Sequence, residues 1–92
     1  ILVADDEVAI REIIKTSLEA HNYRVLTAVD GIDAIAIYVQ HRSEISVVMV
    51  DMMMPAMDGV TTIRTLQKLN SEVKIIATSG LAANDRLLTS VS

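Results

Sequence analysis

The sequence contains no cysteine, no tryptophan and no phenylalanine among its 92 residues. The lack of cysteine excludes disulfides, thiolate metal sites and thiol nucleophiles, and it fits a reducing compartment, so we expect a cytoplasmic protein. Aromatic residues make up only 2% of the chain, and the core must therefore be aliphatic. No apolar stretch approaches the roughly 20 residues of a membrane span, and no signal-peptide pattern opens the chain.

The charge pattern excludes a further class of function. The net charge is −4 and no run of basic residues is present, which argues against direct nucleic-acid binding. Hydrophobic residues make up 51% of the chain and charged residues 22%, a balance typical of one folded domain. The chain opens at Ile1 inside a predicted strand and stops at Ser92 inside a predicted helix, so we expect a piece of a longer polypeptide.

Short apolar runs alternate with longer segments of helical periodicity. The runs lack clear alternation of polar and apolar residues, which predicts a parallel sheet buried on both faces by the intervening helices. Right-handed crossovers leave few topologies for such a chain. The predicted strands are 1–4, 23–28, 47–50 and 74–78, and the predicted helices are 8–18, 31–39, 58–69 and a fourth from Leu81 onward.

The periodicity also predicts which side of each helix is buried. In the first helix Ile10, Ile13, Ile14 and Leu18 share one face, while Arg11, Glu12, Lys15 and Glu19 face solvent. The second helix is predicted to begin at an Asp30 N-cap, and the strand before it to lie near an edge because of Arg24. The third helix is predicted to bury Val60, Ile63, Leu66 and Leu69.

Two of the apolar runs end in carboxylates. Asp51 closes the run 47–50, and Asp5 and Asp6 close the run 1–4. The carboxyl ends of neighbouring parallel strands meet at one rim, which would also receive Ser79. Three carboxylates there would raise one another's pKa unless a cation offset them, and Mg²⁺ is the hard ion that such oxygen ligands favour.

A plainer interpretation is that acids merely suit the positive end of the first helix. We adopt it for Glu7 alone. It does not explain two adjacent aspartates together with a third on another strand. The histidines, His21 and His41, lie at predicted helix ends and are interpreted as solvated surface residues rather than phosphoryl donors.

Three segments in order resemble the receiver domain of two-component response regulators and hybrid histidine kinases. They are Ile-Leu-Val-Ala-Asp-Asp-Glu (1–7), Val-Met-Val-Asp-Met-Met-Met-Pro-Ala-Met-Asp-Gly (48–59) and Ile-Ile-Ala-Thr-Ser-Gly (75–80). The resemblance covers all 92 residues. It implies an α/β, flavodoxin-like, doubly wound parallel sheet with helices on both faces and strand order 2-1-3-4. The family's fifth strand and last helix would be absent, leaving a receiver domain over 1–92 that is incomplete at its C-terminal end.

The resemblance also assigns roles to residues. Asp51 matches the phosphoacceptor, and Asp5 and Asp6 match the acid pair that holds Mg²⁺ with it. Met53 matches the position whose backbone carbonyl completes the metal site, and Ser79 matches the switch hydroxyl. The implied donor is a histidine kinase or histidine phosphotransfer protein, and the implied recipient is an output or kinase domain of the parent chain. The domain would be a signalling module rather than an enzyme.

The sequence departs from the family in lacking the lysine expected after strand four, and the strand itself would form an exposed apolar edge. Such an edge invites exchange with a second chain, so a homodimer is one expected assembly.

The lack of the lysine keeps open a pseudo-receiver that binds partners without phosphorylation. A phosphohydrolase is disfavoured because Met53 stands where a second aspartate would serve as acid. A dinucleotide site is excluded, because 5–7 carries acids in place of a glycine-rich turn.

Overall fold

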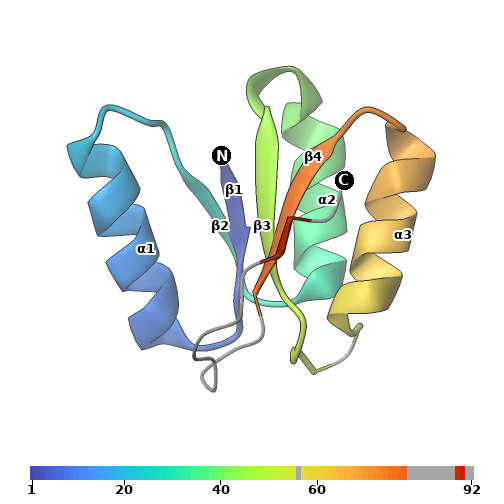
Figure 1. Cartoon of the computed structure of the whole chain (residues 1–92), viewed down its shortest axis with the longest axis horizontal. Coiled ribbons are helices and arrows are strands. Elements are labelled where there is room, and N and C mark those ends of the chain that lie inside the picture. Colours follow the sequence, from blue (N-terminus) through green and yellow to red (C-terminus); the bar gives the residue numbers. More distant parts are fainter. Residues whose placement is uncertain (56, 79–88, 91–92) are drawn as a thin grey trace.

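The computed structural model describes residues 1–55, 57–78 and 89–90, and it forms a single sheet flanked by helices (Figure 1). The strand order is β2-β1-β3-β4-β5, with β1 to β4 parallel, so the predicted order 2-1-3-4 is confirmed. The strands are β1 (Leu2–Ala4), β2 (Leu26–Ala28), β3 (Val47–Asp51), β4 (Lys74–Thr78) and β5 (Thr89–Ser90). The helices are α1 (Val8–Ala20), α2 (Gly31–His41) and α3 (Gly59–Leu69), with a 3₁₀ turn at Arg42–Glu44.

The fifth strand was not predicted. Thr89–Ser90 pairs antiparallel with Ile76 and Ala77 of β4, so the edge expected to be open is partly paired. An edge strand offers unpaired backbone groups, and two residues of the same chain are enough to satisfy some of them. The helix predicted from Leu81 onward lies largely outside the described residues. The next described residues, Thr89–Ser90, form a strand.

Helices cover both faces of the sheet, as predicted. In Figure 1, α2 and α3 lie side by side against one face, and α1 lies against the other. Alternate residues of each strand point into the larger core between the sheet and the α2–α3 pair. That core is aliphatic apart from one tyrosine, and its fully buried large side chains are Leu2, Tyr38, Val48, Val50 and Leu66.

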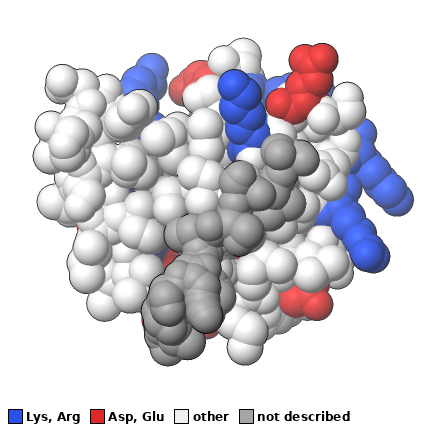
Figure 2. Space-filling model, in the orientation of Figure 1, with Lys and Arg blue, Asp and Glu red and all other residues white. Residues whose placement is uncertain are grey.

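The face of α1 that the periodicity predicts to be buried is not buried. None of the residues of α1 is buried, and Ile10 and Ile13 are 37% and 63% exposed. Figure 2 shows that the side of the molecule formed by α1 presents largely uncharged atoms. Periodicity identified the apolar side of this helix correctly. Among the described residues, the main contacts of the helix are with β1 and β2, and part of its apolar side remains exposed.

The burial predicted for α3 is partly wrong. Ile63 and Leu66 are buried as predicted, whereas Val60 and Leu69 at the two ends of the helix are exposed. Thr62 is fully buried instead. Its Oγ1 donates a hydrogen bond of 2.8 Å to the Asp58 carbonyl, which removes the cost of burying the hydroxyl.

Both α2 and α3 begin at an aspartate N-cap. Asp30 Oδ1 accepts a 2.8 Å hydrogen bond from the Asp33 amide, which confirms the predicted cap, and the Asp33 carboxylate accepts one from the Val29 amide. Asp58 Oδ1 accepts a bond from the Thr61 amide in the same way. Each cap satisfies amides that the first helical turn cannot pair internally.

The C-terminal ends of α2 and α3 are tied together. The Tyr38 ring is fully buried, and its hydroxyl accepts a 3.0 Å hydrogen bond from the Asn70 side chain, just beyond α3. Arg42 lies 5.8 Å from the centre of that ring and donates to the Leu69 carbonyl. These contacts fix the helix pair at the end of the sheet away from the aspartates.

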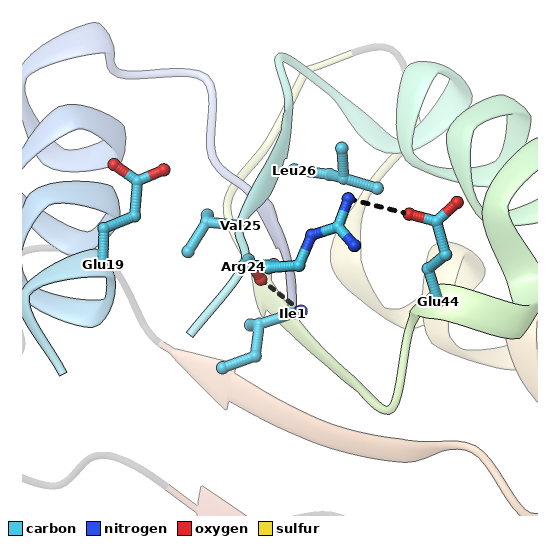
Figure 3. Close-up of a pocket in the computed structure, with 6 residues that line it drawn as sticks. All are labelled: Ile1, Glu19, Arg24, Val25, Leu26 and Glu44. Carbon is cyan, nitrogen blue, oxygen red and sulfur yellow. Dashed lines mark hydrogen bonds and ion pairs between the residues drawn. The ribbon is translucent and has the colours of Figure 1, made fainter. Parts of the chain in front are cut away.

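A shallow hollow lies at the amino ends of β1 and β2 (Figure 3). It contains an ion pair between Arg24 and Glu44, with a distance of 3.6 Å, and a hydrogen bond from the amino group of Ile1 to the Arg24 carbonyl. The Arg24 side chain is 90% exposed, so the pair contributes little stability. Across the described residues, none of the helices has the length and apolar character needed to cross a bilayer.

Replacing Gly31 with alanine is expected to destabilise the protein by about 1–3 kcal/mol. A Cβ at this position would lie 2.7 Å from the Met57 carbonyl oxygen and against Thr62 Oγ1, so the starts of α2 and α3 would have to separate. Urea unfolding measures the change, with Gln40→Ala, an exposed position of the same helix, as the control. Equal or greater stability of Gly31→Ala would show that the close approach is not required.

Candidate functional site

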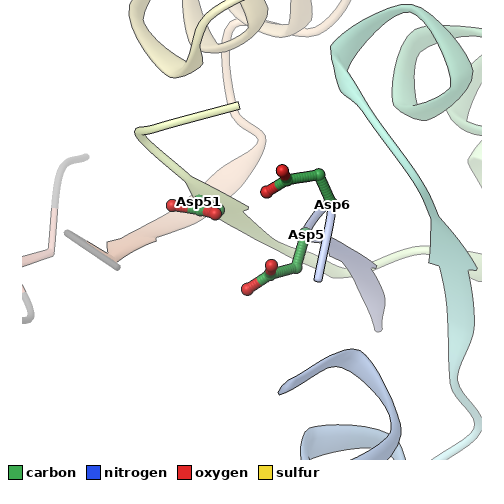
Figure 4. Close-up of side chains that lie close together, drawn as sticks. All are labelled: Asp5, Asp6 and Asp51. Carbon is green, nitrogen blue, oxygen red and sulfur yellow. The ribbon is translucent and has the colours of Figure 1, made fainter. Parts of the chain in front are cut away.

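Asp5, Asp6 and Asp51 converge at the carboxyl ends of β1 and β3 (Figure 4). Each offers a carboxylate oxygen, and these atoms all lie within 4.8 Å of one another. The cause is the register of the two parallel strands, which pairs Ala4 with Val50 and so ends both strands at the same level. Among the described residues, this is the one group of acids with a geometry suited to a metal ion.

Asp5 is held at three points. Its amide donates to the Ala28 carbonyl (3.1 Å), and its Oδ1 accepts from the Glu7 amide (2.9 Å). Its carbonyl accepts a 2.7 Å hydrogen bond from Arg11 Nη1 on α1. The residue is only 5% exposed, whereas Asp6 beside it is exposed. Asp5 is therefore fixed by backbone and side-chain contacts, and Asp6 faces the solvent side of the site.

Asp51 is the last residue of β3 and is also only 5% exposed. Its Oδ1 accepts a 3.0 Å hydrogen bond from the amide of Met53, which turns the chain away from the strand. Gly59 allows α3 to begin close by, because a Cβ there would lie 2.5 Å from Met52 Cα and 3.1 Å from the Asp51 carbonyl oxygen. The carboxylate is thus more enclosed than its position at a strand end predicts.

Burial raises the pKa of both enclosed carboxyls. For Asp5 desolvation is the main cause, opposed by the hydrogen bond from the Glu7 amide and reinforced by the negative charges of Asp6 and Glu7. For Asp51 desolvation again leads, opposed by the Met53 amide and reinforced by Asp5 and Asp6. Within the described part of the chain, no lysine or arginine forms an ion pair with any of the three acids. The negative charge of the cluster is therefore not offset there.

The donor set fits a magnesium ion. Carboxylate oxygens that converge at one rim, two of them enclosed and one open to solvent, suit a hard cation that keeps several of its waters. The same cation would relieve the repulsion that adds to desolvation in raising the two pKa values. Asp5, Asp6 and Asp51 would hold the ion.

The other predicted site residues have different outcomes. Met53 directly follows the cluster and is 74% exposed, and the role of its carbonyl stays a prediction. Ser79 lies outside the described residues, so its role as the switch hydroxyl also stays a prediction.

Arg11 was predicted to face solvent but is half-buried and bonded to Asp5. Its place one helical turn after the acidic loop was the available signal, since an arginine there is long enough to reach back.

A sequence model described as the response regulator receiver domain matches residues 1–91. The chain belongs to this family. A probable transcriptional regulator, ycf27 of Porphyridium aerugineum, is 40% identical over 88 residues, which cover 95% of this chain and 35% of that protein. The sensor kinase CckA of Brucella abortus is 35% identical over 82 residues, which cover 89% of this chain and 9% of the kinase. The chain thus spans only about a third of the first of these relatives and about a tenth of the second.

Solved structures of receivers have the same fold. A response regulator receiver domain protein from Clostridium thermocellum superimposes with a TM-score of 0.80 at 33% identity, covering 86% of this chain and 64% of that one. The receiver domain of the hybrid histidine kinase CckA gives a TM-score of 0.80 at 30% identity, covering 86% and 73%. The CheX–CheY–BeF₃–Mg²⁺ complex of Borrelia burgdorferi gives 0.83 at 27% identity, covering 90% and 63%. These likenesses confirm the flavodoxin-like receiver fold.

Replacing Asp51 with asparagine is expected to stabilise the metal-free protein at pH 7. A carboxyl whose folded-state pKa is raised favours folding while it is protonated, and it loses that contribution as the pH rises through the folded-state pKa. The wild type should therefore gain stability relative to Asp51→Asn as the pH falls from 7 toward the ordinary value of 3.8. Thermal unfolding in EDTA across this range measures the difference.

The exposed cap Asp58 is the control for that series. Its pKa is lowered, chiefly by the hydrogen bond from the Thr61 amide, so its stabilising effect is lost only as the pH falls below the ordinary value. The difference in stability between the wild type and Asp58→Asn should therefore not become smaller between pH 7 and 4. If the stability advantage of Asp51→Asn over the wild type instead grew as the pH fell, the raised pKa of Asp51 would be contradicted.

Proposed function

We propose that this domain accepts a phosphoryl group on Asp51 from a phosphohistidine donor, with Mg²⁺ bound by Asp5, Asp6 and Asp51. The observation that carries the proposal is the convergence of the three carboxylates within 4.8 Å at the carboxyl ends of adjacent strands. A structural role for the acids does not account for this arrangement, because their mutual repulsion and burial oppose folding. Family membership and the Mg²⁺ named in the complex of a structural relative support the same function.

The residues of the chain have distinct tasks in the transfer. An oxygen of Asp51 attacks the phosphorus in line, the bond from phosphorus to the histidine nitrogen breaks, and an acyl phosphate forms on Asp51. The Met53 amide holds Oδ1 at 3.0 Å and so leaves the second oxygen for attack. Asp5, Asp6 and Asp51 would hold a Mg²⁺ ion, which when bound would supply positive charge to neutralise the phosphoryl oxygens. By the family resemblance, the Ser79 hydroxyl would donate a hydrogen bond to the transferred group, and the Met53 carbonyl would be a further ligand of the ion.

The proposed partners follow from this chemistry. The donor is a histidine kinase or a histidine phosphotransfer protein in the cytoplasm, and the recipient of the signal is an output or kinase domain of the parent chain. Relatives of both kinds, a transcriptional regulator and a sensor kinase, share this domain. The phosphoryl group adds charge to an enclosed site, which biases the surrounding surface between two states.

A second candidate is a pseudo-receiver that binds partners without being phosphorylated. The observation that favours it is electrostatic. In the ranges 1–55 and 57–78, no lysine or arginine forms an ion pair with the three acids, so no side chain there is already placed as the partner of a phosphoryl group on Asp51. This candidate retains the fold and the acid cluster but not the transfer.

Incubation with acetyl phosphate and Mg²⁺ is expected to add one phosphoryl group, detected by intact mass. Asp51→Asn should abolish the modification and EDTA should suppress it, while Asp58→Asn, an exposed acid that caps α3, should leave it intact. The reason is that Asp51 lies within the acid cluster at the end of β3, whereas Asp58 is used as the cap of α3. Modification of Asp51→Asn to the wild-type level would refute the assignment. Binding of Mg²⁺ without any modification would favour the pseudo-receiver.

Replacing Met53 with asparagine is expected to shorten the lifetime of the phosphorylated state. Met53 is 74% exposed beside Asp51 and offers no polar group to orient an attacking water, whereas asparagine would. The measurement is the rate of loss of the phosphoryl group after the donor is removed. Met57→Asn, a half-buried methionine of the same loop, is the control. An unchanged rate in Met53→Asn would reject the prediction.

A further inference from the structure

Arg11 is the side chain at the site whose position the sequence did not predict. It belongs to the second turn of α1, and its guanidinium turns back toward the sheet instead of into solvent. Nη1 donates a 2.7 Å hydrogen bond to the carbonyl of Asp5, the residue that joins β1 to the acidic loop. The bond is short and charge-assisted, which places it among the stronger hydrogen bonds of a protein.

The target of this bond is a backbone carbonyl and not a carboxylate. An arginine that served only to neutralise the acids would pair with their side chains, and no such ion pair is present in the described part of the chain. Arg11 therefore leaves the carboxylate oxygens of Asp5 free for a ligand while it fixes the peptide that carries them. Positioning explains this geometry, and charge compensation does not.

The loop needs such an anchor. Asp5, Asp6 and Asp51 repel one another, and the simplest relief is for the β1–α1 loop to move away from β3. The other contacts of Asp5 are bonds to the Ala28 carbonyl and from the Glu7 amide, the second of which lies within the loop itself. Since α1 has no buried residue, packing of the helix holds the loop only weakly.

We propose that Arg11 is a positioning residue of the metal site, which holds the Asp5 peptide so that the carboxylates stay together before the ion binds. The inference rests on the proposed magnesium site. When a residue that holds a metal ligand in place is mutated, the affinity for the metal typically falls by tenfold or more. Arg11 acts on the backbone of a ligand residue, and its loss should weaken Mg²⁺ binding by about tenfold, at the low end of that range.

The sign of the change separates positioning from electrostatics. Removing a positive charge near a cation site should by itself tighten Mg²⁺ binding. Loss of positioning should weaken it. Arg11→Met removes the guanidinium and keeps most of the aliphatic stem. Lys15→Met removes a positive charge that is paired with Glu19 on the same helix.

Mg²⁺ affinity is measured by calorimetry on the purified chain. The expected result is binding about tenfold weaker in Arg11→Met and unchanged or slightly tighter in Lys15→Met. Arg11→Lys keeps the charge and one donor on a shorter stem, and it should be about threefold weaker than wild type. If Arg11→Met does not fold, the affinity of Arg11→Lys is compared with that of the wild type instead. Affinity equal to or tighter than wild type in these Arg11 variants would overturn the inference.

A measurement without metal keeps this test independent of the proposed function. In EDTA, the amide of Glu7, which donates to Asp5 Oδ1, should exchange its hydrogen faster in Arg11→Met than in wild type or Lys15→Met. Unchanged exchange would overturn the positioning role even if Mg²⁺ affinity fell. Failure of the wild type itself to bind Mg²⁺ would instead contradict the proposed function, while the exchange rates would still decide the role of Arg11.

Discussion

The structure depends on keeping three like charges together at the end of a sheet. Two of the carboxylates are nearly inaccessible to water, and burial raises the pKa of each. Isolated acids in such a position would separate or protonate. They remain because strand register, the hydrogen bonds from two loop amides and the close approach of Gly59 to Met52 all constrain them. The rest of the fold supports this unfavourable cluster, and the proposed phosphoryl transfer with a bound cation would account for its cost.

The larger core provides that support on one side only. The α2–α3 pair is fixed at its start by two aspartate caps and the contact of Gly31 with Thr62, and at its end by Tyr38 and Asn70. On the other face the structure describes one helix, α1, and none of its residues is buried. The half of the molecule that holds Asp51 is therefore firmly packed, while the acid pair is attached to the lightly packed half.

The fold and the acid cluster could be predicted because both depend on local patterns. An apolar run that ends in aspartate predicts a strand and marks its carboxyl end. Parallel strands then bring their carboxyl ends to the same edge of the sheet. Burial was harder to predict. Periodicity identifies an apolar face but not the neighbour that would cover it, which explains the exposed Ile13 and Val60. The reach of Arg11 depends on how a long side chain bends, and β5 is too short to leave a pattern.

The light packing of α1 has a consequence for the stability of the site. Proteins open locally in cooperative units, and the unit with the least buried surface opens at the lowest free energy. Among the α-helices that the structure describes, that unit is α1, which follows the loop of Asp5 and Asp6. The acid pair could therefore separate from Asp51 in a brief local opening that leaves β3, β4 and the larger core intact. A cation or partner that bridges the two halves would suppress this opening, so occupancy of the site and order of the first helix would be thermodynamically linked.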